Sequence, residues 1–429
     1  MQHRGQSTSV VGITHHRTPG HEAPVAPSQE GDHRPPSGGF EQQGWVVNWD
    51  DFLFDAATDT GMRRTNNQDS HAIVRAATHD AWLSRGHLFM VADGMGAHAV
   101  GELASKLACD NIPHNYRKSK GISATEAIVK AYKEVGALIH GKATANKEFH
   151  GMGTTCSTLI LLPEGALLAH VGDSRVYRIR QETIDQFSFD HSLVWELVRR
   201  KHLNSDQASR AVPRNVITRS LGPDPNVEVD IVGPLPLEHG DVFLLCSDGL
   251  SGPVTDPELG VFAANFHPSD ACRYVLQLAN LRGGLDNITV VMLRIGQWAE
   301  PGTDEYATLN GKAHEPKSIA WGWKSKLQGL LSRKSAKPVV ELPTPHRSAS
   351  CLITDELLDQ LDEAVRKSQD IAVAQAWSIN WTEFADALRQ QTESRAAGNL
   401  RSTLKSIGEQ IVMLGVAGRL HKKAATAAH

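Results

Sequence analysis

Short apolar runs rich in β-branched and aromatic residues recur along the middle of the chain. Three of these runs occupy residues 88–92, 242–246 and 288–293, and each is bounded by Gly, Asp or Asn. Runs of this length and composition predict strands that are buried in the core. The pattern therefore indicates a sheet-containing fold in which strands from distant parts of the chain come together.

A helix and three consecutive strands are predicted between residues 123 and 180. Ser123 followed by Glu126 is the signature of a capping box, which opens a helix. The apolar positions expected on one face of that helix are Ile128, Ala131, Tyr132, Val135 and Leu138. Residues 155–162, 166–171 and 175–180 have the composition of strands.

The helical period returns near residue 353 and continues toward the C-terminus. The apolar positions with this spacing are Leu357, Leu361, Val365, Phe384, Leu388, Leu400, Leu404, Ile407, Ile411 and Leu414. Asn380 with Glu383 predicts a helix cap, and Gly398 predicts a helix end. Three amphipathic helices in this length predict a small bundle or a docking module that selects a partner or a place.

Asp93, Asp248 and Asp286 stand at the borders of the three apolar runs, and each is followed by Gly or Asn. A carboxylate at the end of a buried strand is held rigidly and can meet others in a cleft. A following glycine lets the backbone turn sharply and leaves its carbonyl oxygen available as a ligand. Sites made only of oxygen suit hard cations such as Mg²⁺ or Mn²⁺. We therefore predict one metal centre; the alternative is that each Asp-Gly pair is an ordinary turn.

Further motifs accompany these aspartates in a recognisable order. They are Gly61-x-x-Arg64-x-x-Asn67-Gln68-Asp69, Val91-Ala-Asp93-Gly94-Met-Gly96-Ala-His98, Gly101-Glu-Leu-Ala-Ser105, Gly153-Thr-Thr155, Val171-Gly-Asp173-Ser-Arg175, Asp190-His-Ser-Leu193, Ile217-Thr-Arg219-Ser-Leu-Gly222, Ser247-Asp248-Gly249-Leu250 and Asp286-Asn287. Through them the chain resembles the metal-dependent Ser/Thr protein phosphatases of the PPM or type 2C family, in a bacterial style. The resemblance implies an α+β fold, a four-layer α-β-β-α sandwich of two antiparallel sheets flanked by helices, with a small C-terminal α-helical region added.

The resemblance also implies a set of metal ligands. Asp93 would bridge two ions, the Gly94 carbonyl would ligate one of them, and Asp248 and Asp286 would complete the shell of the other. The implied reaction is direct attack on phosphorus by a hydroxide that the two ions share, without a covalent phosphoenzyme. Mg²⁺ and Mn²⁺ are the expected cofactors.

Three further site residues follow from the same motifs. Arg64 matches the arginine that grips the substrate phosphate, a task suited to a planar fork of donors. Asp69 would ligate or orient metal-bound water, and Asp173 would hold a weaker third ion. Arg64, Asp69 and Asp93 are thus the expected catalytic residues. The alternatives are an ordinary exposed arginine at position 64 and a charged turn residue at position 173.

The motifs depart from the family pattern at a few positions. Gln68 stands where many relatives have Glu, so water would fill more of the second ion's shell. Met95 replaces a His proposed as general acid in eukaryotic members, and Met has no proton to donate. The general acid is unassigned, with metal-bound water as first choice. Ala97 stands where Gly is usual. His98 is nearby, and a structural or surface role is at least as well supported for it as a catalytic role.

Cysteine usage and charge argue against several other classes. The five cysteines include no Cys-x₅-Arg and no Cys-x-x-Cys, which disfavours a cysteine phosphatase, a zinc site and a disulfide framework. No Walker loop is present, and a net charge of −4 demands no nucleic-acid partner. Without an 18-residue apolar run or a secretory leader, the chain is expected to be cytoplasmic.

Composition divides the chain into four parts. Residues 1–44 are rich in Gly, Pro and polar residues, which predicts a disordered tail. Residues 45–297 form the phosphatase-like domain, in which residues 188–220 match a mobile flap that borders the cleft. Residues 298–350 form a basic, proline-containing linker, and residues 351–429 form the helical C-terminal region.

Within that linker, residues 317–337 hold six Lys or Arg and no acid. Ile319, Trp323, Leu327 and Leu330 fall near one helical face of this stretch. The pattern is compatible with an anionic membrane surface or a partner groove, but a linker helix packed on its own domain is favoured.

Two functions remain open after these observations. The first is an active Mg²⁺/Mn²⁺-dependent phosphatase for phosphoserine and phosphothreonine in proteins, opposing a cognate Ser/Thr kinase. The second is a catalytically weak member that binds phosphoproteins as a regulatory scaffold. Retention of Asp93, Asp248 and Asp286 favours the first.

Overall fold

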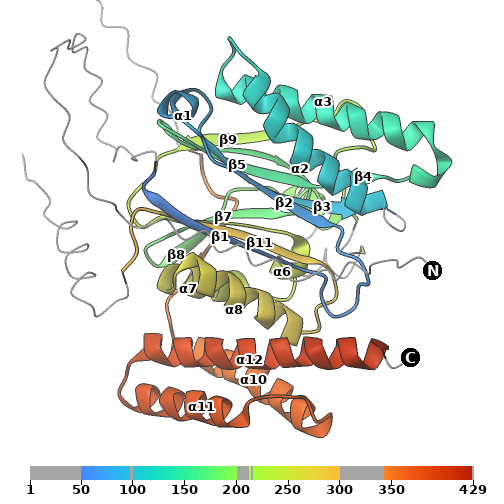
Figure 1. Cartoon of the computed structure of the whole chain (residues 1–429). Coiled ribbons are helices and arrows are strands. Elements are labelled where there is room, and N and C mark those ends of the chain that lie inside the picture. The colour runs from blue at the N-terminus through green and yellow to red at the C-terminus, as the bar shows by residue number, and fades with distance from the viewer. Residues whose placement is uncertain (1–49, 97–99, 201–211, 214–215, 300–342, 428–429) are drawn as a thin grey trace, which may run out of the picture.

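Two antiparallel β-sheets lie face to face at the centre of the molecule (Figure 1). The computed structural model describes residues 50–96, 100–200, 212–213, 216–299 and 343–427. Within these ranges the first sheet has the strand order β1-β11-β10-β7-β8-β12. The second sheet has the order β2-β3-β5-β6-β9, with β4 paired to β3.

The strands of the two sheets include counterparts of the predicted runs at residues 88–92, 155–162, 166–171, 175–180, 242–246 and 288–293. Those of the first sheet are β1 Phe52–Asp59, β7 Arg175–Arg180, β8 Thr183–Gln186, β10 Val242–Cys246, β11 Ile288–Ile295 and β12 Arg347–Ser350. Those of the second sheet are β2 Asp69–Val74, β3 His87–Met95, β4 Gly153–Thr154, β5 Cys156–Leu162, β6 Gly165–Val171 and β9 Asp230–Leu235.

Helices cover the outer face of each sheet, so the predicted four-layer α-β-β-α sandwich is confirmed (Figure 1). Helices α2 and α3 pack on the second sheet, and α7 and α8 pack on the first. The helices up to residue 281 are α1 His79–Arg85, α2 Val100–Lys118, α3 Ala124–Ala145, α4 Leu193–Arg199, α6 Asp248–Ser251, α7 Asp256–Asn265 and α8 Pro268–Leu281, with a 3-10 turn at Lys147–Phe149.

The continuous apolar runs arise because both faces of the central strands are covered. In β3, Phe89 and Val91 join the cluster between the sheets, whereas Leu88 and Met90 join the cluster under α2 and α3. Successive side chains of a strand point to opposite faces. A strand buried on both faces therefore needs apolar residues at every position, as residues 88–92 have.

The predicted helix after Ser123 is confirmed as α3, including both halves of the capping box with Glu126. Its buried face differs from the prediction at one position. Leu138 is 40% exposed, and Ile139 is buried in its place. Ile139 follows Val135 by four positions, so the two side chains lie on the same face of the helix. Leu138 therefore lies at the edge of the buried face.

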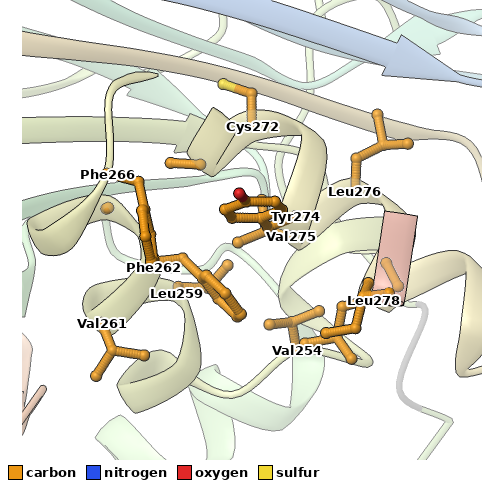
Figure 2. Close-up of a cluster of buried hydrophobic side chains, with 14 of the residues drawn as sticks. Val254, Leu259, Val261, Phe262, Phe266, Cys272, Tyr274, Val275, Leu276 and Leu278 are labelled. Carbon is orange, nitrogen blue, oxygen red and sulfur yellow. The ribbon is translucent and has the colours of Figure 1, made fainter. Parts of the chain in front are cut away.

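A third apolar cluster lies between the first sheet and helices α7 and α8. Figure 2 shows three of its aromatic side chains, Phe262 from α7, Phe266 at the C-terminal cap of α7 and Tyr274 from α8. The rings of Phe266 and Tyr274 meet edge to face with centroids 5.2 Å apart. Aromatic pairs favour this geometry because the ring edge is positive and the ring face negative.

The C-terminal region forms a further layer below α8 (Figure 1). The three predicted helices are present as α10 Asp355–Ala374, α11 Trp381–Ala396 and α12 Leu400–Ala427. Asn380 caps α11 as predicted, because its side chain accepts from the Glu383 N–H. We call these three helices the helical layer. Their apolar faces pack against the two-sheet sandwich, since Leu361, Leu404 and Ile411 belong to the same cluster as Tyr274.

Residues 347–350 fall within the predicted linker but form strand β12, which pairs with β8 at the edge of the first sheet. Its sequence Arg-Ser-Ala-Ser has no apolar alternation that would predict a strand. Cys351 follows it into the core, where an added Cβ on Gly260 of α7 would lie 2.4 Å from the Cys351 Cβ. The strand thereby ties the helical layer to the sheet.

Several predicted features lie outside the described residues. These are the tail 1–44, the basic stretch 317–337 and His98, while the flap 188–220 is described in part. The five cysteines are buried and free, which confirms the absence of a disulfide framework. Among the helices described, none combines the length and apolar character that crossing a bilayer requires.

Truncating Ile411 tests whether the helical layer and the two-sheet sandwich share one core. Ile411 is fully buried, so Ile411→Ala should lower the free energy of unfolding by roughly 2–5 kcal/mol. Val416 on the same helix is 43% exposed, so Val416→Ala should change it by less than about 0.5 kcal/mol. Urea unfolding followed by circular dichroism measures both. Equal effects, or a separate transition for α12, would contradict a shared core.

Candidate metal centre

Two carboxylates meet on neighbouring strands of the second sheet. Asp69 begins β2, Asp93 lies near the end of β3, and the two residues are directly paired in the antiparallel register. The Asp93 N–H donates to Thr155 Oγ1 at 2.9 Å, and its carbonyl accepts from the Thr155 N–H at 2.9 Å. The backbone at Asp93 is therefore fixed, which leaves only its side chain free to turn.

Three more carboxylates reach the same place from elsewhere. Asp173 lies in the turn between β6 and β7, Asp248 begins α6 just after β10, and Asp286 precedes β11. The negative charges of all three, with that of Asp69, help to raise the pKa of Asp93. The structure thus brings together the five predicted acidic residues, which we call the carboxylate cluster: Asp69, Asp93, Asp173, Asp248 and Asp286.

Burial and mutual repulsion make the ionised cluster unfavourable. Burial, with the charges of Asp248 and Asp286, raises the pKa of Asp69 to about 7, although hydrogen bonds from Ser247 and Thr289 oppose this shift. Burial and Asp248 raise the pKa of Asp173 to about 8. Burial also raises the pKa of Asp93 well above its usual range, with Asp69 as the next cause. Such a group of acids is stabilised by positive charge placed among them.

Three oxygens of the cluster are buried without a hydrogen-bond partner within the described residues. They are Oδ1 of Asp69, Oδ1 of Asp173 and Oδ1 of Asp248. Buried polar atoms in folded proteins are nearly always satisfied, so buried carboxylate oxygens without a hydrogen-bond partner need an explanation. Hard divalent cations bind this type of oxygen, so the donor set fits Mg²⁺ or Mn²⁺.

The side chains of the carboxylate cluster are not arranged as a complete set of metal ligands in this structure. Across the described ranges, no three His, Cys, Asp or Glu side chains are grouped closely enough to hold an ion. Asp286 explains part of this, because its Oδ2 accepts from Arg64 at 2.7 Å and its Oδ1 accepts from the Asn287 N–H at 2.9 Å. Each Asp286 oxygen thus already accepts one hydrogen bond, which competes with an ion for its lone pairs.

The pairing of Arg64 with Asp286 differs from the expectation for both residues. The resemblance implied that Arg64 grips phosphate and that Asp286 binds metal, whereas here they form a salt bridge. Half of the Arg64 side chain is exposed, which leaves the guanidinium reachable from solvent. The bridge fixes Arg64 at the edge of the cluster, where its charge offsets part of the repulsion.

The glycines after Asp93 and Asp248 have a different role from the one predicted. Neither has positive φ, so a sharp turn is not the reason for glycine. Instead, a Cβ on Gly94 would lie 2.0 Å from the Gly101 carbonyl oxygen, and one on Gly249 would lie 2.0 Å from the Asn287 carbonyl oxygen. Glycine is required because two backbones approach closely beside the cluster.

Ser247 and Asn287 position the site, although sequence reasoning gave them no role. Ser247 Oγ donates to Asp69 Oδ2 at 2.7 Å and accepts from the Thr289 N–H at 3.0 Å. Asn287 Nδ2 donates to the carbonyls of residues 60 and 66, and its Oδ1 accepts from the Gln68 N–H. Ser247 and Asn287 each stand next to a predicted aspartate in a motif, and this position in the sequence could have indicated their role in the site.

The Asp-His-Ser-Leu motif at 190–193 supports the turn that carries Asp173. His191 Nδ1 accepts from the Gly172 N–H at 3.0 Å, and the His191 N–H donates to the Gly172 carbonyl at 2.8 Å. Asp190 accepts from Arg175 at 2.7 Å, on the other side of the same turn. The motif therefore acts on the cluster through the backbone at 172–175.

A cavity of about 630 Å³ opens beside the cluster. Asp173 and Asp248 are among its lining residues. Trp195 of α4 and Arg347 of β12 also line it, with the Arg347 guanidinium 5.3 Å from the Trp195 ring centre. Arg347 also contacts the Asp256 carboxylate. The cavity thus reaches two residues of the carboxylate cluster.

Known proteins are similar to this chain in sequence. The sequence profile of the protein phosphatase 2C family matches residues 62–281. The chain is 33% identical over 253 residues to the protein phosphatase PhpP of Streptococcus pneumoniae, covering 56% of this chain and 96% of the relative. It is 32% identical over 241 residues to the serine/threonine phosphatase stp of Listeria welshimeri, covering 55% and 93%.

Solved structures agree with the sequence relatives. The serine/threonine phosphatase PstP/Ppp of Mycobacterium tuberculosis matches with a TM-score of 0.51 and 29% identity, over 58% of this chain and all of that one. The serine/threonine phosphatase of S. agalactiae matches with a TM-score of 0.52 and 30% identity, over 57% and 99%. By fold and relatives, the chain is a serine/threonine protein phosphatase. It belongs to the protein phosphatase 2C family, as its motifs predicted, and the family profile ends before the helical layer.

Replacing a glycine beside the cluster tests the close backbone approach. Gly249→Ala places a Cβ against a backbone oxygen, so it should lower the free energy of unfolding by about 3 kcal/mol. Gly141 lies in α3 with open space around it, so Gly141→Ala should be neutral or stabilising by up to about 1 kcal/mol. Thermal unfolding of both variants gives the comparison. A Gly249→Ala protein as stable as Gly141→Ala would refute the packing argument.

Proposed function

We propose that this chain is a divalent-metal-dependent phosphatase that removes phosphate from phosphoserine and phosphothreonine in proteins, opposing a cognate Ser/Thr kinase. The observation that carries the proposal is the set of unpartnered, buried carboxylate oxygens among aspartates whose charges repel one another, with Arg64 paired to Asp286 and a cavity lined by Asp173 and Asp248. The names of the bacterial relatives support the phosphoprotein substrate class.

The metal would be Mg²⁺ or Mn²⁺, held by Asp93, Asp248 and Asp286 with the Gly94 carbonyl, while Asp69 and Asp173 lie next to this set. When bound, two divalent ions would supply the Lewis acidity that activates water and offsets charge on the phosphoryl oxygens. Asp173 is the proposed ligand of a third ion. The unpartnered Oδ1 atoms of Asp69, Asp173 and Asp248 support these assignments.

Arg64 would hold the substrate phosphate through its planar fork of donors. Its salt bridge with Asp286 must open for this, which also frees an Asp286 oxygen for an ion. Ser247 donates to one Asp69 oxygen, and the other Asp69 oxygen is buried without a hydrogen-bond partner in the described structure. Met95 has no proton for the leaving alkoxide, so we assign that proton to water.

The cavity between α4 and β12 is the proposed place for the residues that flank the phosphorylated side chain. Its outer wall combines Trp195 and Pro257 with the paired charges of Arg347 and Asp256. Because those charges are already paired, this wall favours neutral side chains over strongly charged ones.

Phosphate release from a phosphothreonine peptide tests the proposal. The wild-type chain should turn over with Mn²⁺ and stop when the metal is chelated. Asp93→Asn and Asp248→Asn should each lower kcat by at least about 100-fold, since each removes a charged oxygen ligand. Asp370, exposed on α10, provides the matched control, and Asp370→Asn should retain full activity. Absence of any metal-dependent turnover would leave the regulatory scaffold as the function.

Arg64→Ala separates phosphate binding from metal binding. KM for the peptide should rise about tenfold or more, because a charged donor to phosphate is lost. Affinity for Mn²⁺, measured by calorimetry without substrate, should stay equal or increase, because Asp286 loses its competing partner. Weaker Mn²⁺ binding by this variant would mean that the salt bridge supports the ion site instead of competing with it.

A further inference from the structure

Helix α12 of the helical layer reaches the edge of the candidate site. Arg419, near its C-terminal end, is largely buried and contacts the Asp59 carboxylate at the end of β1. Nε and Nη2 of Arg419 are buried without a directed hydrogen bond in the part of the chain described. The Asp59 carboxylate, itself 4% exposed, therefore supplies the charge that balances this guanidinium.

The Asp59 carboxylate also fixes the start of the segment that carries Arg64. Asp59 Oδ1, the atom in contact with Arg419, accepts from the Gly61 N–H at 2.7 Å. Gly61 has φ of +77°, and a Cβ there would lie 2.1 Å from the Asp286 carbonyl oxygen. Its position is therefore set on one side by Asp59 and on the other by the backbone that carries Asp286.

The next two residues are held equally firmly. The N–H groups of Met62 and Arg63 both donate to the Gly284 carbonyl, at 2.7 and 3.1 Å. Arg64 follows immediately, so the hydrogen bonds of residues 61–63 also restrict the position of its backbone. We call residues 60–68 the Arg64 loop.

Helix α12 is seated closely enough to transmit this constraint. An added Cβ on Gly408 would lie 3.0 Å from the Tyr274 ring, and one on Gly415 would lie 2.3 Å from Gln277. Both partners belong to α8, which leads directly into the segment with Gly284 and Asp286. In Figure 1, α12 runs beneath α8 and ends on the side where β1 turns into the Arg64 loop.

The end of α12 also interacts with this loop through charge. Burial lowers the pKa of Lys422, and the positive charges of Arg419 and Arg63 lower it further. Lys422 lies about one helical turn from Arg419, so both residues belong to the same face of α12.

We propose that Arg419 is a positioning residue for Arg64, through Asp59 and the Gly61 amide. This inference rests on the proposed function, because Arg64 is taken there to hold the substrate phosphate. It gives the helical layer a part in substrate recognition that the matched family region lacks on its own. Arg419 does not contact the substrate. It fixes the backbone position from which the Arg64 side chain extends toward the phosphate.

A double-mutant cycle with Arg64 tests the assignment in the full chain. Arg419→Met should lower kcat/KM for the phosphothreonine peptide by about tenfold, mainly through KM, because the guanidinium is displaced from its place. In the Arg64→Ala background, the same substitution should change kcat/KM by less than about twofold, because nothing remains to be positioned. Arg419→Lys should recover part of the loss, since it keeps the charge beside Asp59.

Arg395 provides the matched control within the same layer. It forms ion pairs with Asp355 and Asp359 on α10 and contacts no part of the Arg64 loop in the described structure. Arg395→Met should leave kcat/KM within about twofold of wild type. Wild type and this control are assayed alongside the cycle, so a failure of the proposed function shows as inactivity of both.

Hydrogen exchange provides a readout that does not depend on activity. In Arg419→Met, the amides of residues 61–63 should exchange at least about tenfold faster, while those of β3 and β5 stay protected. If the single variant unfolds, Asp59→Asn with Arg419→Met removes both charges and is measured instead. Equal loss of kcat/KM in both Arg64 backgrounds, or unchanged exchange at 61–63, would overturn the proposal.

Discussion

The repulsion among five acidic side chains gathered at one end of two sheets is the constraint on which this structure depends. Asp69 and Asp93 are paired across neighbouring strands, so the fold holds these two residues close together, about one strand spacing apart. Burial and shared negative charge raise the pKa of Asp69 and Asp173 into the neutral range. A fold that retains this arrangement has to balance it with positive charge, and only a few positively charged side chains are nearby.

The surrounding structure is built to hold this arrangement still. Gly94 and Gly249 let backbones approach to within contact distance beside two of the aspartates. Ser247 links Asp69 to β11, and Asn287 links β11 to the Arg64 loop. These hydrogen bonds connect the two sheets at the end where the carboxylates meet. Rigid support of this kind is what a metal and phosphate site requires, because small displacements weaken both.

The helical layer extends that support beyond the region shared with the relatives. It contributes Leu404 and Ile411 to the core beneath α8, and strand β12 joins it to the edge of the first sheet. The layer is therefore continuous with the phosphatase domain in its packing. Its influence on the site passes through two routes, the cavity wall at Arg347 and the charge contact between Arg419 and Asp59.

Much of the fold could be predicted from the chain because the strands are covered on both faces and read as unbroken apolar runs. The capping box at Ser123 and the cap at Asn380 gave correct helix starts for the same local reason. Strand β12 was missed because pairing with β8 stabilises it, and its own residues carry no strand signal. The motifs identified the aspartates whose charges act on one another in the structure, but the Arg64–Asp286 bridge and the close packing at Gly94 arise from tertiary approach, which spacing along the chain does not encode.

The central claim is that the carboxylate cluster binds divalent cations. Anomalous scattering from crystals soaked in Mn²⁺ tests it most directly, because it locates the ion independently of catalysis. We expect at least two peaks within coordination distance of Asp93, with Asp248 and Asp286 oxygens turned toward them. A map with no peak among these side chains, and with the Arg64–Asp286 bridge intact in the presence of Mn²⁺, would contradict the account.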